Sequence, residues 1–222
     1  MKKNLKTAGP IRLAIRTIFT ILTVGLMALA GGGWSFFQRP VAVIASVLWI
    51  AWLEAVQAGR PLGRGSAYDR KQQFVMGLSS IAMMGFMIAA PWEYAHFSGP
   101  IPRDGILAWI GILVFAAGVV IQTYALWIMH GQYTVRLGIQ PGHHLVKDGP
   151  YRYIRHPGYM SHLMCMLGMS LAFSSLVGLA LSLVMIPVLY RRTLTEEAML
   201  EKEFGEEYRA YQGRTGRLLP RI

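Results

Sequence analysis

The residues best suited to chemistry lie in two polar segments of an otherwise apolar chain. The first segment, residues 143–159, reads HHLVKDGPYRYIRHPGY and holds three histidines among several basic side chains. The second segment, residues 191–208, reads RRTLTEEAMLEKEFGEEY and holds six of the eleven acidic residues. One long apolar run separates the two segments. Two polar segments that flank a membrane hairpin indicate a site built at a membrane surface.

The start of the helix expected after His156 could bind an anion. Proline is well placed in the first turn of a helix, so Pro157 predicts a helix start there. The free backbone N–H groups of such a start can hold a carboxylate, and Arg155 and His156 add donors beside it. Considered alone, Arg155 would more often be an anchor at the membrane interface, and His156 would more often make a local backbone contact.

Composition excludes several other kinds of site. His143 and His144 are adjacent and have no cysteine or acidic partner at ligand spacing, so no metal site is predicted. The net charge of +11 fits basic loops on one side of a membrane better than nucleic-acid binding, because no basic face with interleaved aromatic residues is present. Cys165 is the only cysteine, so an intrachain disulfide is impossible.

The elements that must position the two segments are membrane helices. Hydrophobic residues make up 54% of the chain and charged residues 15%, whereas soluble proteins carry about 25% charged residues. A span needs about 20 apolar residues, which four of the five apolar runs supply. The fifth is too long for one span, and Ser174, Ser175 and Gly178 interrupt it. The five runs are residues 17–37, 41–58, 73–92, 105–129 and 158–190.

These runs predict an all-α integral membrane protein with four spans, a C-terminal transmembrane hairpin over residues 158–190 and a cytoplasmic amphipathic helix. Small residues are expected to let the hairpin helices approach closely, namely Gly158, Ser161, Gly168 and Ala172. We expect residues 1–104 to form an N-terminal unit of three helices. Residues 105–222 would form a core with a loop over 130–157, the hairpin and a helix over 193–211.

Basic residues predict the orientation in the membrane. They gather before the first run, after the second, after the fourth and after the hairpin, whereas Arg39 and Arg103 fall on the opposite side. This positive-inside pattern places both termini and both polar segments in the cytoplasm, in an inner or plasma membrane. Glu54 is the one acid expected within a span, and either a function or simple pairing near the membrane surface fits it.

The final helix is expected to begin at Thr193. Thr193 and Glu196 match a capping box, and Leu200, Phe204 and Tyr208 recur at helical spacing. The helix would lie on the bilayer, but its acidic residues suit an anionic leaflet poorly. Some of them are therefore expected to face the basic residues 143–159 or a ligand.

Together the two segments resemble the isoprenylcysteine carboxyl methyltransferase family, and more distantly the phospholipid N-methyltransferases. The resemblance rests on H-x-L-V-x-x-G-P-Y-R-x-x-R-H-P-x-Y, a hydrophobic hairpin, and E-E-x-x-L-x-x-x-F-G-x-x-Y, and it covers about residues 105–222. The chain departs from the family at Ser161, where glycine is usual, and at Leu194 and Thr195. These departures affect the expected acceptor more than the cofactor.

The resemblance implies S-adenosylmethionine as cofactor, held between the loop before the hairpin and the helix after it. The cofactor-binding residues carried over by position are His143, Leu145, Val146, Gly149, Tyr151, His156, Pro157, Tyr159, Glu196 and Glu197. Arg192 matches a family arginine and would orient an anionic acceptor, with Arg155 as second candidate. His156 would gain importance as a base if the acceptor were an amine.

The implied function is methyl transfer to a lipophilic or lipid-modified acceptor that enters from the membrane lipid, at a carboxylate of an isoprenylcysteine-like group. Two alternatives stay open. An NADPH-dependent membrane reductase of the sterol reductase type looks similar around R-H-P-x-Y. A non-catalytic membrane scaffold would bind no cofactor and would tolerate substitution of Tyr151 and Glu197.

Overall fold

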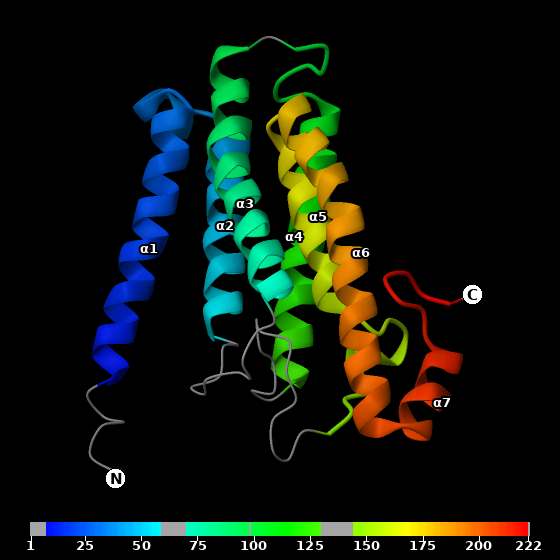
Figure 1. Ribbon diagram of the computed structural model, residues 1–222. Helices are drawn as coiled ribbons and strands as arrows, with labels where there is room; N and C mark the ends of the chain where they lie inside the picture. The colour runs from blue at the N-terminus through cyan, green and yellow to red at the C-terminus, as the bar shows by residue number, and fades with distance from the viewer. Residues whose placement is uncertain (1–7, 59–69, 98, 130–143, 222) are drawn as a thin grey trace.

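The structure, a computed structural model, describes residues 8–58, 70–97, 99–129 and 144–221, and over these residues it is helical without strands (Figure 1). The predicted all-α fold is therefore confirmed. The helices are α1 (Ala8–Ala30), α2 (Pro40–Ala58), α3 (Arg70–His96), α4 (Ile106–Ile128), α5 (Pro157–Ala172), α6 (Leu176–Phe204) and α7 (Glu206–Arg214). Short 3-10 helices cover Gly33–Gln38 and Gly149–Arg152.

Four of the described helices are long and apolar enough to cross a membrane, namely α1, α2, α4 and α6. Helix α5 has 16 residues, fewer than the roughly 20 that a full span needs. It returns into α6 through residues 173–175, so the predicted hairpin is confirmed. The chain is an integral membrane protein.

The hairpin turn is capped from both sides. The Ser175 hydroxyl accepts a hydrogen bond from the Gly178 backbone N–H at 2.8 Å. Glu93 of α3 accepts hydrogen bonds from the backbone N–H groups of Leu176 and Val177 at 3.1 and 3.0 Å. A carboxylate at a helix N-terminus satisfies otherwise unpaired donors and suits the helix dipole. Glu93 thus ties α3 to the start of α6.

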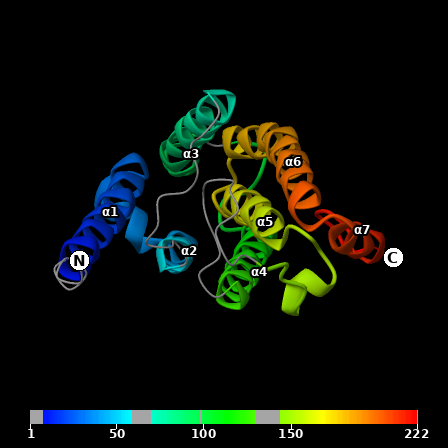
Figure 2. The ribbon, with the colours of Figure 1, turned by 60° about the horizontal axis from the view of Figure 1, so that its bottom comes forward.

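The small residues of the hairpin serve a different contact from the one predicted. A methyl group added at Gly168 would lie 2.5 Å from the Phe115 backbone nitrogen, and one at Gly111 would lie 2.4 Å from the Ala172 nitrogen. Ser161 donates a hydrogen bond to Gln122 of α4. The expectation that these residues seat α5 against α6 is therefore wrong for Gly168, Ser161 and Ala172, because they seat α5 against α4. Figure 2 shows α4 and α5 side by side.

The expected start of a separate helix at Thr193 is also wrong. Helix α6 runs without interruption past this residue to Phe204, and the buried Thr193 hydroxyl donates to the Tyr190 carbonyl at 2.7 Å. A threonine that bonds back to the preceding turn has no need to cap a new helix. The break falls instead at Gly205, which has a φ of 51°, a conformation that glycine adopts at little cost.

The two polar segments lie at one end of the bundle. Figure 1 shows the start of α5 and α7 at the same end as the start of α1, and the hairpin turn at the other end. At the first end, Glu54 of α2 pairs with Arg16 of α1, so the pairing interpretation of Glu54 is confirmed. The division of the chain at residue 104 stays a prediction.

Candidate active site

The loop before α5 is shaped by a glycine and a proline. Gly149 has a φ of 56°, and a methyl group added there would lie 2.0 Å from Ile128, so the loop passes close over the end of α4. Pro157 stands in the first turn of α5, as predicted, and His156 precedes it at the N-cap position. The start of α5 therefore points the His156 ring toward α6.

Glu197 is the centre of the site. Its side chain is 6% exposed, and its Oε1 atom accepts a hydrogen bond from Arg155 Nε at 2.8 Å and lies 3.2 Å from His156 Nε2. Its Oε2 atom accepts hydrogen bonds from Arg217 Nη2 at 2.7 Å and Nε at 3.1 Å. A buried carboxylate is stable only when paired and hydrogen-bonded in this way. The fold thus joins the first polar segment to the second through His156 and Glu197.

The C-terminal tail completes this cluster. Backbone hydrogen bonds join Arg155 N–H to the Gly216 carbonyl at 2.8 Å and His156 N–H to the Arg217 carbonyl at 3.1 Å. Arg155 also donates through Nη1 to the carbonyls of Gln212 and Thr215. Arg155 is therefore held by the protein itself, which makes it a residue that positions Glu197 rather than one open to a ligand.

Arg217 is a site residue that the sequence reasoning missed. It lies 20 positions after Glu197, in a tail without helical periodicity, and no local pattern links the two. The one available signal was the excess of acidic charge over residues 196–207, which requires basic partners.

A second group of side chains lies beside Glu197. Arg192 Nε donates to the Tyr159 hydroxyl at 2.7 Å, and the guanidinium carbon lies 5.6 Å from the centre of the Tyr159 ring. The Tyr159 and His156 rings are 5.7 Å apart. His156 Nδ1 is 3.8 Å from Glu196 Oε2, so His156 lies between the two carboxylates. The expected residues Arg192, Tyr159, His156, Glu196 and Glu197 are thus close together.

The remaining predicted loop residues precede α5 in the chain. Leu145, Val146, Gly149 and Tyr151 are partly buried. The Tyr151 carbonyl accepts a hydrogen bond from the Tyr211 hydroxyl of α7 at 2.6 Å, so the loop and α7 are fixed to each other. His143 lies outside the described residues.

Some of the acidic residues face the basic loop, as predicted, whereas Glu201 and Glu206 pair with Arg209. In addition to the Glu197 pairs, Lys147 Nζ lies 2.6 Å from Glu207 Oε1, with both side chains exposed. An exposed pair of this kind contributes about 0–1 kcal/mol to the stability of the fold, so the contact between the loop and α7 depends little on it.

Tyr208 supplies an unsatisfied polar atom next to the cluster. The residue is fully buried, and its hydroxyl has no hydrogen-bond partner in the described part of the chain. Burial, and next the negative charge of Glu197, raise the pKa of Tyr208 above its ordinary value, so the hydroxyl remains a donor. An orphaned buried hydroxyl beside Glu196 and Glu197 suits a polar ligand group.

Over the described residues, no three histidine, cysteine or acidic side chains are grouped to hold a metal.

Comparison with protein families supports the predicted resemblance. Residues 106–207 match the family model described as phospholipid methyltransferase. This matched segment includes the start of α5, the hairpin and the Glu196–Glu197 pair, and it ends before Arg217.

Curated relatives point the same way. The chain is 37% identical over 81 residues to a protein-S-isoprenylcysteine O-methyltransferase of Schizosaccharomyces pombe, covering 36% of this chain and 34% of that protein. It is 29% identical over 119 residues to a probable protein-S-isoprenylcysteine O-methyltransferase of Oryza sativa subsp. indica, covering 52% of this chain and 62% of that protein. The chain thus spans from about a third to under two thirds of the length of these relatives.

A solved structure shares the fold. The eukaryotic intramembrane Ras methyltransferase, isoprenylcysteine carboxyl methyltransferase, aligns with a TM-score of 0.60 over 95% of this chain and 77% of that chain, at 21% identity. These comparisons confirm the resemblance of this chain to the isoprenylcysteine carboxyl methyltransferase family.

Proposed function

We propose that this protein is a membrane methyltransferase that uses S-adenosylmethionine and methylates a carboxylate on a lipophilic, isoprenylcysteine-like acceptor. The observation that carries the proposal is the junction of His156 and Glu197, 3.2 Å apart, inside the segment that matches the methyltransferases. The relatives named above favour this reading over the reductase and the scaffold.

The residues present fit the cofactor. Its ammonium group suits Glu196, whose side chain is 32% exposed and is therefore open to a ligand. The carboxylate of the cofactor suits the start of α5 at Pro157. The Tyr208 hydroxyl can donate a hydrogen bond to an oxygen atom of a ligand. Leu145, with Tyr151, would give adenine an apolar contact. The full proposed set is His143, Leu145, Val146, Gly149, Tyr151, His156, Pro157, Tyr159, Glu196 and Glu197.

Glu197 has a supporting role in this proposal. Both of its oxygens accept hydrogen bonds from Arg155, Arg217 or His156, so it fixes the loop, α6 and the tail in one arrangement. A fixed arrangement matters because methyl transfer depends on alignment of the reacting atoms more than on proton transfer.

The acceptor would be oriented by Arg192. Its Nε atom donates to Tyr159, so the tyrosine holds the guanidinium in place next to the start of α5. A guanidinium donates to a carboxylate through several N–H groups in one plane and so fixes its direction. When bound, S-adenosylmethionine supplies an electrophilic methyl group, and an ionised carboxylate needs no base to attack it. His156 would become the base only for an amine acceptor.

We place this site at the cytoplasmic face of an inner or plasma membrane. The proposal rests on the positive-inside pattern of the sequence and on the shared end of the bundle at which α5 begins and α7 lies. A lipophilic acceptor would reach the site from the lipid between the spans.

The cofactor assignment is tested by calorimetry of the intact protein with S-adenosylhomocysteine. We expect binding in the unaltered protein, weaker binding in Glu196→Gln and His156→Ala, and unchanged binding in the control Glu203→Gln, an exposed acid of the same helix. Absence of binding to the intact protein would overturn the proposal. Competition by NADPH would favour the reductase instead.

A further inference from the structure

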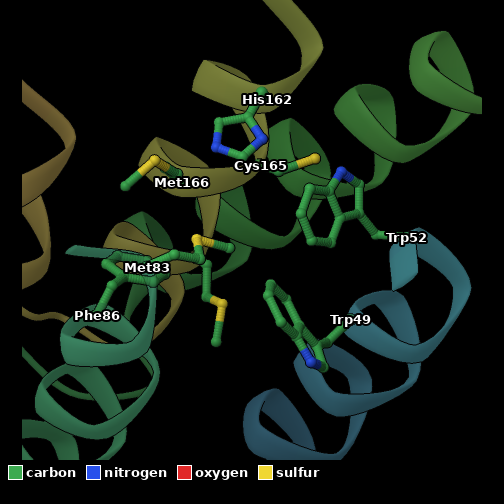
Figure 3. A pocket seen from close by; sticks show the side chains of 8 residues that line it. Trp49, Trp52, Met83, Phe86, His162, Cys165 and Met166 are labelled. Carbon is green, nitrogen blue, oxygen red and sulfur yellow. The ribbon is translucent and has the colours of Figure 1, made fainter. Parts of the chain in front are cut away.

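A narrow pocket lies between α2, α3 and α5, within the apolar part of the molecule (Figure 3). The space between its atoms amounts to about 170 Å³, part of which is open to the surroundings, and it is too narrow to admit a water molecule. Three methionines line it, Met83, Met166 and Met169. Methionine side chains are flexible and adapt to irregular shapes, so this wall can move aside for a ligand.

The pocket contains an unsatisfied hydrogen-bond donor. Trp52 is 7% exposed, and its indole Nε1 has no hydrogen-bond partner in the portion of the chain that the structure describes. The neighbouring Trp49 differs, because its Nε1 donates to the Thr23 hydroxyl at 3.4 Å. Trp52 lies within the predicted span of α2, where lipid offers no water to pair with the donor.

His162 stands beside this donor. Its ring lies 5.4 Å from the Trp52 ring at an angle of 54°, and it lines the same pocket (Figure 3). A histidine within a membrane helix is a candidate for function by default. One carbonyl oxygen has two lone pairs and can accept a hydrogen bond from each of the two rings.

The pocket adjoins the proposed active site. His162 follows Tyr159 by three residues on α5, which places it on the same side of the helix about 5 Å further into the membrane. Tyr159 is the residue that holds Arg192. A molecule whose carboxylate reaches Arg192 would therefore extend its apolar part toward Trp52 and His162.

We propose that this pocket binds the apolar part of the methyl acceptor, and that Trp52 and His162 hydrogen-bond to one uncharged oxygen on that part. This inference rests on the proposed function, which gives the site a methyl acceptor. The inference narrows the acceptor to amphiphilic carboxylates that carry an uncharged oxygen about one helical turn from the methylated group. A plain hydrocarbon chain would leave the Trp52 N–H unpaired.

The test uses matched probes and the full-length protein in lipid nanodiscs. The probes are radiolabelled N-acetyl-S-alkylcysteines of equal chain length, with either an all-hydrocarbon chain or one ketone at successive chain positions, and equilibrium filtration measures their affinity. At one position near the headgroup, we expect the ketone to bind about tenfold more tightly than the hydrocarbon, as one ordinary hydrogen bond would give.

Two variants assign the effect to Trp52. Trp52→Phe keeps an aromatic ring at this position, although a smaller one, and removes the unpaired N–H, so it should abolish the ketone preference. Trp49→Phe is the matched control from the same pocket, and it should keep the preference because the Trp49 N–H is directed to Thr23. Thermal unfolding verifies that both variants are folded. If a variant does not fold, the probe series in the unaltered protein still measures whether the ketone is preferred.

Equal affinity for every ketone and the hydrocarbon would overturn the inference, as would a preference that survives in Trp52→Phe. The ketone preference is measured without cofactor, so its failure and a failure to bind S-adenosylhomocysteine are distinguishable.

Discussion

At the scale of single residues, the buried charge of Glu197 decides how the site is held together. Glu197, with a 6% exposed side chain, faces two guanidinium groups and one imidazole. Removal of one partner from a buried ion pair leaves the others uncompensated, which costs more than the pair contributed. Substitutions at this residue should therefore affect both stability and the geometry of the site.

Glu197→Gln should lower the free energy of unfolding by about 3 kcal/mol, because Arg155 and Arg217 lose their shared negative partner. It should also weaken S-adenosylhomocysteine binding. Chemical denaturation in detergent and calorimetry measure the two effects. Glu201→Gln is the control, since Glu201 pairs with the exposed Arg209 at the surface. Equal effects of the two substitutions would contradict a central role for Glu197.

Arg217 should act as a positioning residue. Arg217→Met should reduce the rate of methyl transfer with little change in acceptor KM, because it frees one oxygen of Glu197 without touching the acceptor. Arg217→Lys should restore part of the rate, since lysine keeps the charge but loses the two-point contact. Arg221→Met in the same tail is the control, as the Arg221 side chain donates its hydrogen bond to the Gly213 carbonyl and not to Glu197. An unchanged rate in Arg217→Met would contradict this role.

At the scale of helices, the contact between α4 and α5 holds the start of α5 in place. Gly168→Ala should destabilise the protein by about 2 kcal/mol, because the added methyl group would lie 2.5 Å from the Phe115 backbone nitrogen. Thermal unfolding measures the effect. Gly25→Ala in α1 is the matched control, since nothing lies within 4 Å of the added group. Equal stability of the two variants would show that α4 and α5 are not packed this closely.

The apolar parts of the helices and the hairpin were predictable from the sequence, whereas helix ends, helix partners and the tail were not. The apolar runs and the interruption at Ser174 and Ser175 are local signals, and both elements follow from them. The partner of Gly168 depends on how helices pack in three dimensions. Thr193 mimics a cap in the sequence, yet the helix continues because its backbone donors already have partners in the preceding turn.

The site shows the same division. His156, Glu196 and Glu197 stand in recognisable motifs, so the pairing of their two segments was predictable once the hairpin was identified. Arg217 and the Tyr208 hydroxyl depend on the path of the tail and on the packing of α7. These contacts join residues far apart in the chain, which no spacing rule describes.

At the scale of the whole molecule, the two ends of the bundle should face different compartments. In a Cys165→Ser background, Glu206→Cys should react with a membrane-impermeant maleimide only after cells are opened. Pro100→Cys at the other end should react in intact cells. The reason is the positive-inside pattern, with α7 at the end where basic residues gather. The reverse labelling pattern would contradict the cytoplasmic placement of the site.

Methyl transfer itself is measured with S-adenosylmethionine that carries a labelled methyl group. The purified protein in lipid nanodiscs is incubated with this donor and N-acetyl-S-farnesylcysteine, and separately with a membrane extract. We expect the lipophilic product to carry label that base releases, because a methyl ester is hydrolysed by base, and we expect Arg192→Ala to lose this product. Absence of labelled product from both acceptors, in a protein shown to be folded, would mean that this protein does not methylate such carboxylates.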